Sequence, residues 1–161
     1  MRTPVPGSTG YSTPSEREIR IERHFNAPRS LVYAAWSDPK HVPRWMSGPE
    51  GWSMPVCEID LRPGGKWRYV LRMGNGAEMT LQGVYREVVP MERVVTTESW
   101  GPDWPESLNT MELTEANGIT TMVITILYNS RKERDAALES GMKQGMDQGF
   151  ALLDQLLVSL R

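Results

Sequence analysis

The sequence predicts an α+β domain in which a curved antiparallel sheet of about seven strands wraps around one long C-terminal helix. Three observations predict it. Strand-like runs separated by short turn-forming segments fill the middle of the chain, and connections this short join antiparallel neighbours. From Ser130 onward no proline occurs, and apolar residues recur at three- and four-residue steps. That apolar stripe must be buried, and the apolar face of the sheet is the only large partner for it.

The composition fits a single domain. The chain has 161 residues and a mass of 18.2 kDa, within the usual ~100–200 residues per domain. Its 18 basic and 20 acidic residues give a net charge of −2, which argues against a partner recognised by its phosphate backbone, such as nucleic acid. The single cysteine, Cys57, excludes an internal disulfide and a cysteine-based zinc cluster.

The N-terminal segment is rich in proline, glycine and hydroxyl residues. It predicts a flexible leader over residues 1–15, followed by one domain over residues 16–161. The leader has no apolar run of the signal-peptide type, and no stretch of ~18 apolar residues occurs in the chain. We therefore expect a cytoplasmic protein without a membrane span.

The first strand and two short helices follow the leader. Alternation over Glu18–Phe25 predicts a half-buried strand. Asn26-Ala27-Pro28 predicts a helix start, with Asn26 as the cap and Pro28 in the first turn. Ser37-Asp38-Pro39 repeats this signal, and we expect a second short helix that ends near Trp45.

Six further strands are predicted between the short helices and the last helix. Their separators include Pro63-Gly64-Gly65, Gly74-Asn75-Gly76 and Asn117-Gly118, all typical of turns. The six runs are Met54–Leu61, Lys66–Met73, Glu78–Val88, Arg93–Trp100, Leu108–Thr114 and Thr120–Tyr128.

The last helix begins at a capping box, Ser130-Arg131-Lys132-Glu133, and is expected to run to the end of the chain. Gly141, Gly145 and Gly149 lie four apart on it, and each costs up to ~1 kcal/mol relative to alanine. Tight packing against a bulky strand residue and space for a cavity explain these glycines equally well.

Several motifs in a fixed order resemble one known family. They are Phe25–Tyr33 followed by Trp36–Pro39, Arg44-Trp45, Asp60–Gly65, Gly83–Tyr85, Val89–Arg93, and Gly141-Met142 with Gly145. Over about residues 18–160 the chain resembles the heat shock protein 90 ATPase activator-like proteins, of the START-like (SRPBCC) superfamily. The resemblance implies the helix-grip fold and an internal cavity for an apolar ligand between the sheet and the C-terminal helix. Fold alone does not decide function, because this superfamily includes lipid carriers, hormone receptors, polyketide cyclases and co-chaperone domains.

Aromatic and methionine side chains are the candidate ligand contacts, because rings offer apolar area and methionine adapts to varied shapes. For each one alone, filling the core is the stronger expectation; for the set, at least one is expected to reach a cavity. The candidates are Trp36, Trp45, Trp67, Tyr69, Tyr85, Trp100, Met142, Met146 and Phe150.

Acid–base candidates are few. Glu58 and Asp60 share a strand face, but Asp60 is better explained as holding the Arg62–Gly65 turn. Glu98 or Arg68 could orient a polar ligand group inside the pocket, or could belong to a salt-bridged sheet surface.

No metal site or cofactor is expected. His24 and His41 have no ligand at metal spacing, and their expected roles are at the surface or in a cap. A dinucleotide fingerprint, a phosphate loop and a nucleophile elbow are all missing.

Three functions follow from these observations. The leading hypothesis is the binding of a small apolar or amphipathic, lipid-like ligand, without catalysis. The alternative is an interaction module for a chaperone partner, which the resemblance implies. The third is a cavity enzyme of the cyclase or hydrolase type, which would need an ionisable side chain with a displaced pKa in the cavity. A homodimer through an exposed strand edge is a further option.

Overall fold

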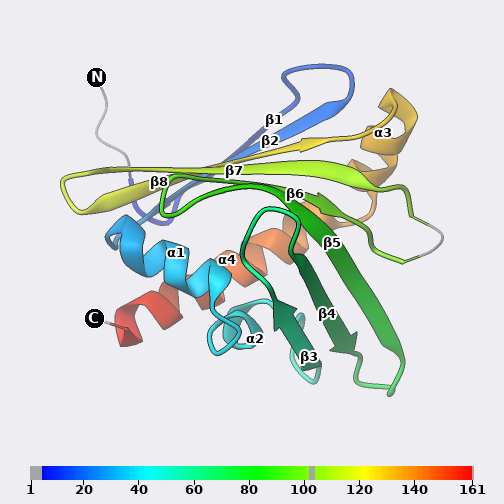
Figure 1. Ribbon diagram of the computed structural model, residues 1–161, viewed down its shortest axis with the longest axis horizontal. Coiled ribbons are helices and arrows are strands. Elements are labelled where there is room, and N and C mark those ends of the chain that lie inside the picture. The colour runs from blue at the N-terminus through cyan, green and yellow to red at the C-terminus, as the bar shows by residue number, and fades with distance from the viewer. Residues whose placement is uncertain (1–4, 102–103, 161) are drawn as a thin grey trace.

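The computed structural model describes residues 5–101 and 104–160 and shows an α+β fold with one open antiparallel sheet. The eight strands lie in the order β1-β2-β8-β7-β6-β5-β4-β3 (Figure 1). The strands are β1 (Thr9–Ser12), β2 (Glu18–Phe25), β3 (Ser53–Ile59), β4 (Lys66–Arg72), β5 (Glu78–Val89), β6 (Arg93–Glu98), β7 (Ser107–Ala116) and β8 (Ile119–Leu127). The helices are α1 (Arg29–Ser37), α2 (Val42–Trp45), α3 (Arg131–Glu139) and α4 (Met142–Ser159).

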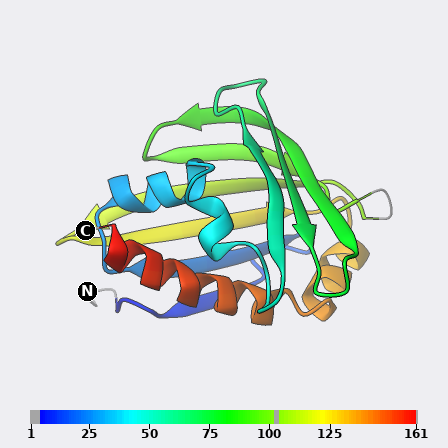
Figure 2. The ribbon, with the colours of Figure 1, turned by 90° about the horizontal axis from the view of Figure 1, so that it is seen from below.

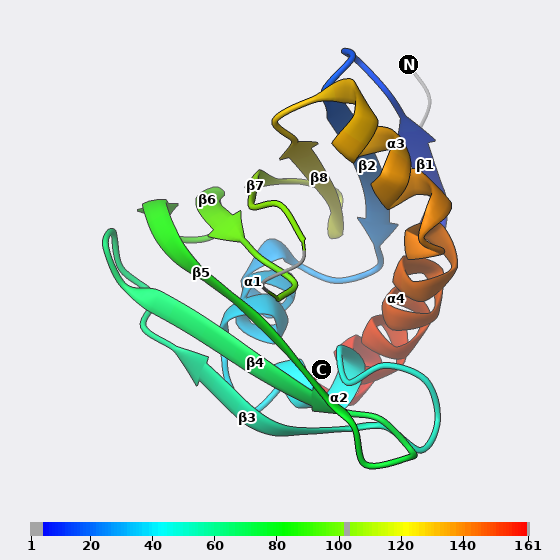
Figure 3. The ribbon, with the colours of Figure 1, turned by 90° about the vertical axis from the view of Figure 1, so that its right-hand side faces the viewer.

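The sheet bends around the last helix. Figure 2 shows α4 lying across one face of the sheet, with α1 and α2 beside it. Viewed from the side, the strands form an arc from β3 to β1, and α4 runs along the open side of that arc (Figure 3). The hydrophobic core fills the space between this concave face and the three helices, because the apolar stripe of α4 (Phe150, Leu153, Leu156 and Leu157) is buried there.

Strand register decides which side chains face the core. Along β2, buried and half-buried residues alternate, as the sequence pattern predicted. Thr96 pairs with Tyr85 on β5 and with Asn109 on β7, so these three side chains share the concave face. Glu98 is two residues from Thr96 and lies on that same face.

The predicted strands and the capping box are confirmed. All six runs after the short helices form strands, and no bound is shifted by more than two residues. Ser130 Oγ accepts a hydrogen bond from Glu133 N at 3.1 Å, which caps α3. The Glu133 carboxylate accepts from Asn129 N at 3.0 Å, one residue before the expected partner.

An eighth strand lies inside the segment expected to be a flexible leader. β1 (Thr9–Ser12) pairs antiparallel with β2, from Thr9 opposite Arg23 to Ser12 opposite Arg20. For these four residues the expectation of a leader was wrong. The composition of the segment gave no sign of a strand, because the pairing is made with a distant segment and not by local preference.

The prediction of a single long C-terminal helix was also wrong. Gly141 has φ +86°, in the left-handed region, and separates α3 from α4. Glycine adopts this conformation without a steric penalty, so it ends one helix and lets the next begin. The glycine cost expected for this position therefore does not arise.

The start of α1 is capped differently from the prediction. The cap position is Pro28, not Asn26, and no side chain of its own caps the helix. Instead, Glu115 Oε1 from the end of β7 accepts a hydrogen bond from Arg29 N at 2.7 Å. The second short helix begins later than expected, at Val42, after a turn in which Asp38 Oδ1 accepts from Lys40 N.

Within the part of the chain that the structure describes, every helix is too short or too polar to cross a membrane.

Candidate functional site

Eight of the nine predicted contact residues gather in one hydrophobic cluster. The exception is Trp100, which follows β6, stands outside the cluster and is 44% exposed. The eight are Trp45, Trp67, Tyr69, Tyr85 and Phe150, with the partly buried Trp36, Met142 and Met146 packed against them. The structure brings these side chains together from α1, α2, β4, β5 and α4. Whether any of them touches a ligand stays a prediction.

The rings form two contact pairs on opposite sides of this interior. Trp36 and Trp45 lie 4.9 Å apart between ring centroids, and Trp67 and Tyr69 lie 4.8 Å apart. One indole in each pair is oriented by a hydrogen bond: Trp45 Nε1 donates to Ala35 O at 2.9 Å, and Trp67 Nε1 donates to Thr96 Oγ1 at 2.8 Å. These bonds fix the tilt of the rings.

Gly83 makes room for Trp67. The two residues are opposite one another on β5 and β4, and a Cβ on Gly83 would lie 1.8 Å from Thr97 O and 2.6 Å from Trp67 Nε1. Only glycine leaves enough space for the backbone of β6 and the indole. Packing therefore explains why the Gly83-Val84-Tyr85 motif begins with glycine.

The Asp60–Gly65 loop holds Tyr85 in place. Gly64, with φ +84°, donates from its N to Tyr85 O at 2.8 Å, and Gly65 O accepts from Tyr85 N at 2.9 Å. A Cβ on Gly65 would lie 2.0 Å from Asp60 O, so the loop closes only with glycine there. Asp60 forms an exposed ion pair with Arg62 at 2.9 Å, as expected for a residue that holds this turn.

Glu98 is the acidic group on the concave face beside these rings. Asn109 Nδ2 donates to its Oε2 at 2.6 Å, and the indole N–H of Trp100 is a second donor. Burial raises the pKa of the Glu98 carboxyl, and these two hydrogen bonds lower it in part. None of the ion pairs formed by the described residues includes Glu98.

Arg68 and Glu58 lie outside this interior. They form an exposed ion pair at 3.3 Å on the opposite face of the sheet, so for Arg68 the salt-bridged surface was the right alternative. Glu58 and Asp60 each bind an arginine and not one another.

Three phenols and one thiol surround the same interior. Burial, and then the nearness of Tyr85 and Cys57, raises the pKa of Tyr69. Burial also raises the pKa of Tyr85, with a further contribution from Tyr33. The pKa of Tyr128 is raised to about 12 by burial and by Glu98. Burial and the Asp38 carboxylate raise the pKa of Cys57 to about 11, so this thiol is protonated at neutral pH and is a poor nucleophile.

Four buried side-chain polar atoms have no hydrogen-bond partner among the described residues. Three lie on the helical side, Tyr33 Oη and Trp36 Nε1 of α1 and His41 Nδ1 at the start of α2, and the fourth is Nε of Arg23 on β2. A buried donor or acceptor left unpaired costs about 1–3 kcal/mol. His41 was expected at the surface or in a cap; it does occupy the cap position of α2, with this ring nitrogen buried and no side-chain capping bond.

The described residues contain no cluster of three or more histidine, cysteine or acidic side chains able to hold a metal ion. His24 instead binds Thr121 Oγ1 at 2.9 Å, and its Nε2 lies 3.4 Å from Glu22.

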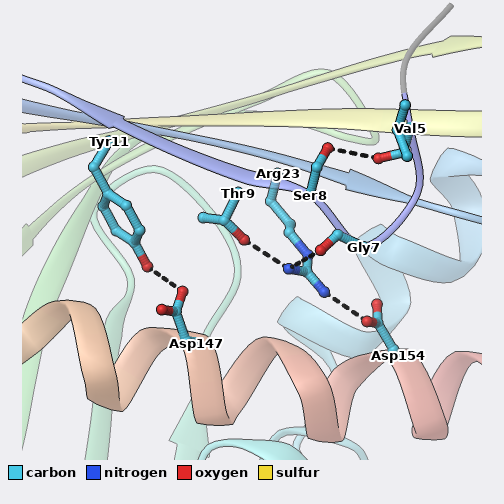
Figure 4. Close-up of polar contacts among 8 residues, drawn as sticks. All are labelled: Val5, Gly7, Ser8, Thr9, Tyr11, Arg23, Asp147 and Asp154. Atoms are coloured by element: carbon cyan, nitrogen blue, oxygen red, sulfur yellow. Dashed lines mark hydrogen bonds and ion pairs between the residues drawn. The ribbon is translucent and has the colours of Figure 1, made fainter.

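A polar seam joins α4 to the N-terminal strands (Figure 4). Arg23 of β2 forms an ion pair with Asp154 of α4 at 2.5 Å and donates to Gly7 O and Thr9 Oγ1. Tyr11 of β1 donates to Asp147 of α4 at 2.6 Å. We call these contacts the β1–α4 seam; they hold α4 along one edge of the interior.

Two surface pockets, of about 460 and 450 Å³, lie elsewhere. The first is lined by Arg29 and Leu113–Glu115, and the second crosses the outer part of β5, β6, β7 and β8. None of the nine predicted contact residues lines either of them.

Tyr33, Cys57, Asn109 and Tyr128 were not among the predicted site residues. Strand alternation could have placed Cys57 and Asn109, because each is two residues from a core position on its strand. Tyr33 and Tyr128 lie on a helix face and just after a strand, where periodicity gives a weaker signal.

Comparison with known proteins agrees with this architecture. A protein from Rhodobacter sphaeroides of known crystal structure is 27% identical, with a TM-score of 0.90 over 96% of this chain and 100% of that chain. An AHSA1-like protein from Aeromonas hydrophila is 20% identical, with a TM-score of 0.72 over 86% and 93% of the two chains, which supports the fold alone. No curated protein gave a significant match.

The family model for Activator of Hsp90 ATPase homolog 1-like proteins (AHSA1) matches residues 26–158. That range runs from the loop before α1 to the last turn of α4, and it includes the whole aromatic interior described above. The chain therefore belongs to the AHSA1-like family, with the START-like fold.

Proposed function

We propose that the protein binds a small amphipathic molecule between the concave face of the sheet and α4. The observation that carries the proposal is the set of three buried polar atoms without partners, Tyr33 Oη, Trp36 Nε1 and His41 Nδ1, beside an aromatic cluster. A folded protein rarely leaves several such atoms unpaired unless something else completes their hydrogen bonds.

The composition of the interior suits a ligand of this kind. Aromatic and methionine side chains supply apolar contact area, and a few polar groups (Glu98, Asn109 and the tyrosines) supply orientation. Trp36 Nε1 can only donate, so we expect the ligand to offer an acceptor near α1. Ligand binding of this kind needs no catalytic step. The cytoplasmic location expected from the sequence stays a prediction.

Native mass spectrometry of the freshly purified protein tests the proposal, followed by extraction and identification of any released molecule. We expect a reproducible adduct of small mass. Binding of the neutral fluorescent probe N-phenyl-1-naphthylamine is the second measurement, because it does not need a ligand retained from the host.

Two tryptophan variants make the probe measurement specific. Trp36→Phe removes the unpaired indole N–H inside the interior, and Trp104→Phe alters a ring that is 47% exposed. We expect the first to change probe affinity by about fivefold, the equivalent of about 1 kcal/mol, and the second to leave it unchanged. An apo mass together with no probe binding would contradict the proposal.

A chaperone-associated role is the second candidate. It is favoured by the family match and by the two exposed tryptophans near the β6–β7 connection, Trp100 and Trp104, since tryptophan is enriched in protein interfaces. Stimulation of the ATPase activity of an Hsp90-type chaperone from the same organism tests it. We expect Trp100→Ala to reduce any stimulation, and no stimulation by the unmodified protein would remove this candidate.

A further inference from the structure

We propose that the ligand carries a protonated amine with apolar substituents, and that the Glu98 carboxylate and the aromatic rings beside it hold that cation. This inference rests on the proposed function and names the chemical class of the ligand.

The first argument is an unmatched charge. Glu98 lies on the concave face of β6, and its two hydrogen-bond donors, Asn109 and Trp100, are both neutral. Carboxylates taken out of water are normally paired with a cation or a metal ion. Among the described residues, no arginine or lysine forms an ion pair with Glu98, so its counter-charge has to come from outside this part of the chain.

Three arginines that could have neutralised Glu98 form ion pairs with other carboxylates. On β4, Arg68 pairs with Glu58 on the outer face, and on β6 itself Arg93 pairs with Glu87 and Glu112. Arg23, which also faces the interior, is 8% exposed and is already paired with Asp154. A negative ligand would thus find no free cation here, whereas a positive one would find a free carboxylate.

The second argument is the ring arrangement. Tyr85 is directly opposite Thr96, two residues from Glu98, and Trp67 is tied to the same Thr96 by its indole hydrogen bond. Tyr69 packs against Trp67, and its pKa responds to Glu98. The faces of aromatic rings attract cations, most strongly when water is excluded. A carboxylate with several aromatic rings beside it is suited to bind an organic ammonium group.

Three matched probes separate the alternatives: 3-phenylpropylamine, 3-phenylpropan-1-ol and 3-phenylpropanoate share one apolar body and differ in the charge of the head. Their affinities for the full chain are measured by isothermal titration calorimetry or by protein NMR. We expect the amine to bind at least about tenfold more tightly than the alcohol, and the carboxylate to bind most weakly.

Glu98→Gln tests the residue itself. It keeps the size of the side chain, so we expect the advantage of the amine to disappear while the affinity for the alcohol stays within about twofold. Glu58→Gln is the matched control, because Glu58 is a carboxylate on the exposed face, and it should behave like the unmodified protein. Circular dichroism shows whether the Glu98 variant is folded. If it is not, Glu98→Asp replaces it and should weaken the preference without removing it.

The outcomes are distinct. Equal binding of the three probes, preference for the alcohol, or an amine preference that survives in Glu98→Gln would overturn the inference and leave the proposed function standing. If none of the three probes nor N-phenyl-1-naphthylamine binds, the proposed function fails and this inference fails with it.

Discussion

The carboxylates of Glu98 and Asp154 are both partly buried, and they differ in what neutralises them. Asp154 on α4 is paired with Arg23, while Glu98 on β6 has only the neutral donors Asn109 and Trp100. Burial raises the pKa of both, and in Asp154 the arginine opposes that effect. The charges of the β1–α4 seam are therefore matched among the described residues, although Arg23 Nε has no hydrogen-bond partner, whereas the aromatic interior has a charge that these residues leave unmatched.

The same contrast appears in two tyrosines. Tyr11 in the seam donates to Asp147 at 2.6 Å, and Tyr33 on α1 has a buried hydroxyl with no partner among the described residues. Groups that only stabilise a fold are expected to have partners, because an unpaired buried group costs free energy. Three of the four unpaired side-chain atoms among the described residues lie on α1 and at the start of α2, which supports the binding of another molecule on that side.

The largest effect is expected from breaking the seam. Asp154→Ala leaves the Arg23 guanidinium buried without its counter-charge, and we expect the free energy of unfolding to fall by about 3 kcal/mol. Urea denaturation measures it. Glu58→Ala, which breaks an exposed pair, should change it by less than about 1 kcal/mol. Equal losses in both variants would show that the seam is no more than a surface contact.

Replacing tyrosine by phenylalanine should change the stability of the protein differently at two positions. Tyr11→Phe removes a satisfied hydroxyl and should destabilise the protein by about 1 kcal/mol. Tyr33→Phe removes an unpaired one and should leave stability unchanged or raise it by up to about 1 kcal/mol in the empty protein. Both are read from denaturation midpoints. A loss at Tyr33 as large as at Tyr11 would mean that its hydroxyl has a partner.

A pH series distinguishes Glu98 from an ordinary surface acid. Because the pKa of Glu98 is raised in the folded state, the folded protein holds this proton more tightly than the unfolded chain does. Its contribution to stability is fully present below the unfolded pKa and is lost as the pH rises through the folded pKa. We therefore expect Glu98→Gln to match the unmodified protein near pH 4 and to be the more stable of the two near pH 7.

The comparison is made by denaturation at each pH. A tightly bound amine should reverse the difference near pH 7, since the cation stabilises the carboxylate and not the amide. A constant difference between the two proteins at every pH would contradict the role given to this group.

The smallest effect concerns the glycines of α4. A Cβ on Gly145 would meet no atom within 4 Å, and one on Gly149 would lie 3.6 Å from Trp45 O, an ordinary contact. We expect each Gly→Ala change to raise the free energy of unfolding by up to about 1 kcal/mol, from helix propensity alone. If Gly149→Ala also weakens probe binding and Gly145→Ala does not, the side of α4 that faces Trp45 adjoins the ligand.

Local signals predicted much of this fold. The capping box at Ser130 and the turns at Gly64 and Gly76 depend on neighbouring residues, and the sequence therefore reveals them. β1 depends on a partner strand, and the cap of α1 depends on Glu115, far along the chain. Gly141 had a local signal, a glycine that follows Ser140 at a helix end, but the continuing apolar stripe concealed it.

The site was predicted less completely than the fold. Residue type and alternation placed Trp67, Tyr69 and Tyr85 on the inner face, where the structure shows them. For Glu98 the sequence left two roles open, and only the register with Asn109 and the outward pairing of Arg68 separate them. The absence of a hydrogen-bond partner for the Tyr33 hydroxyl depends on three-dimensional packing, so no pattern in the sequence could have predicted it.

The short strand β1 also covers an edge of β2 that would otherwise be open to pairing with another molecule. It covers the backbone of β2, whose Ile19, Ile21 and Phe25 are fully buried. A chain shortened to begin at Glu16 would present β2 as a long, bare edge with unpaired amides and carbonyls, and exposed edges of this kind pair with neighbouring molecules. The four residues of β1 thus cover part of that edge, and Tyr11 also ties β1 to α4.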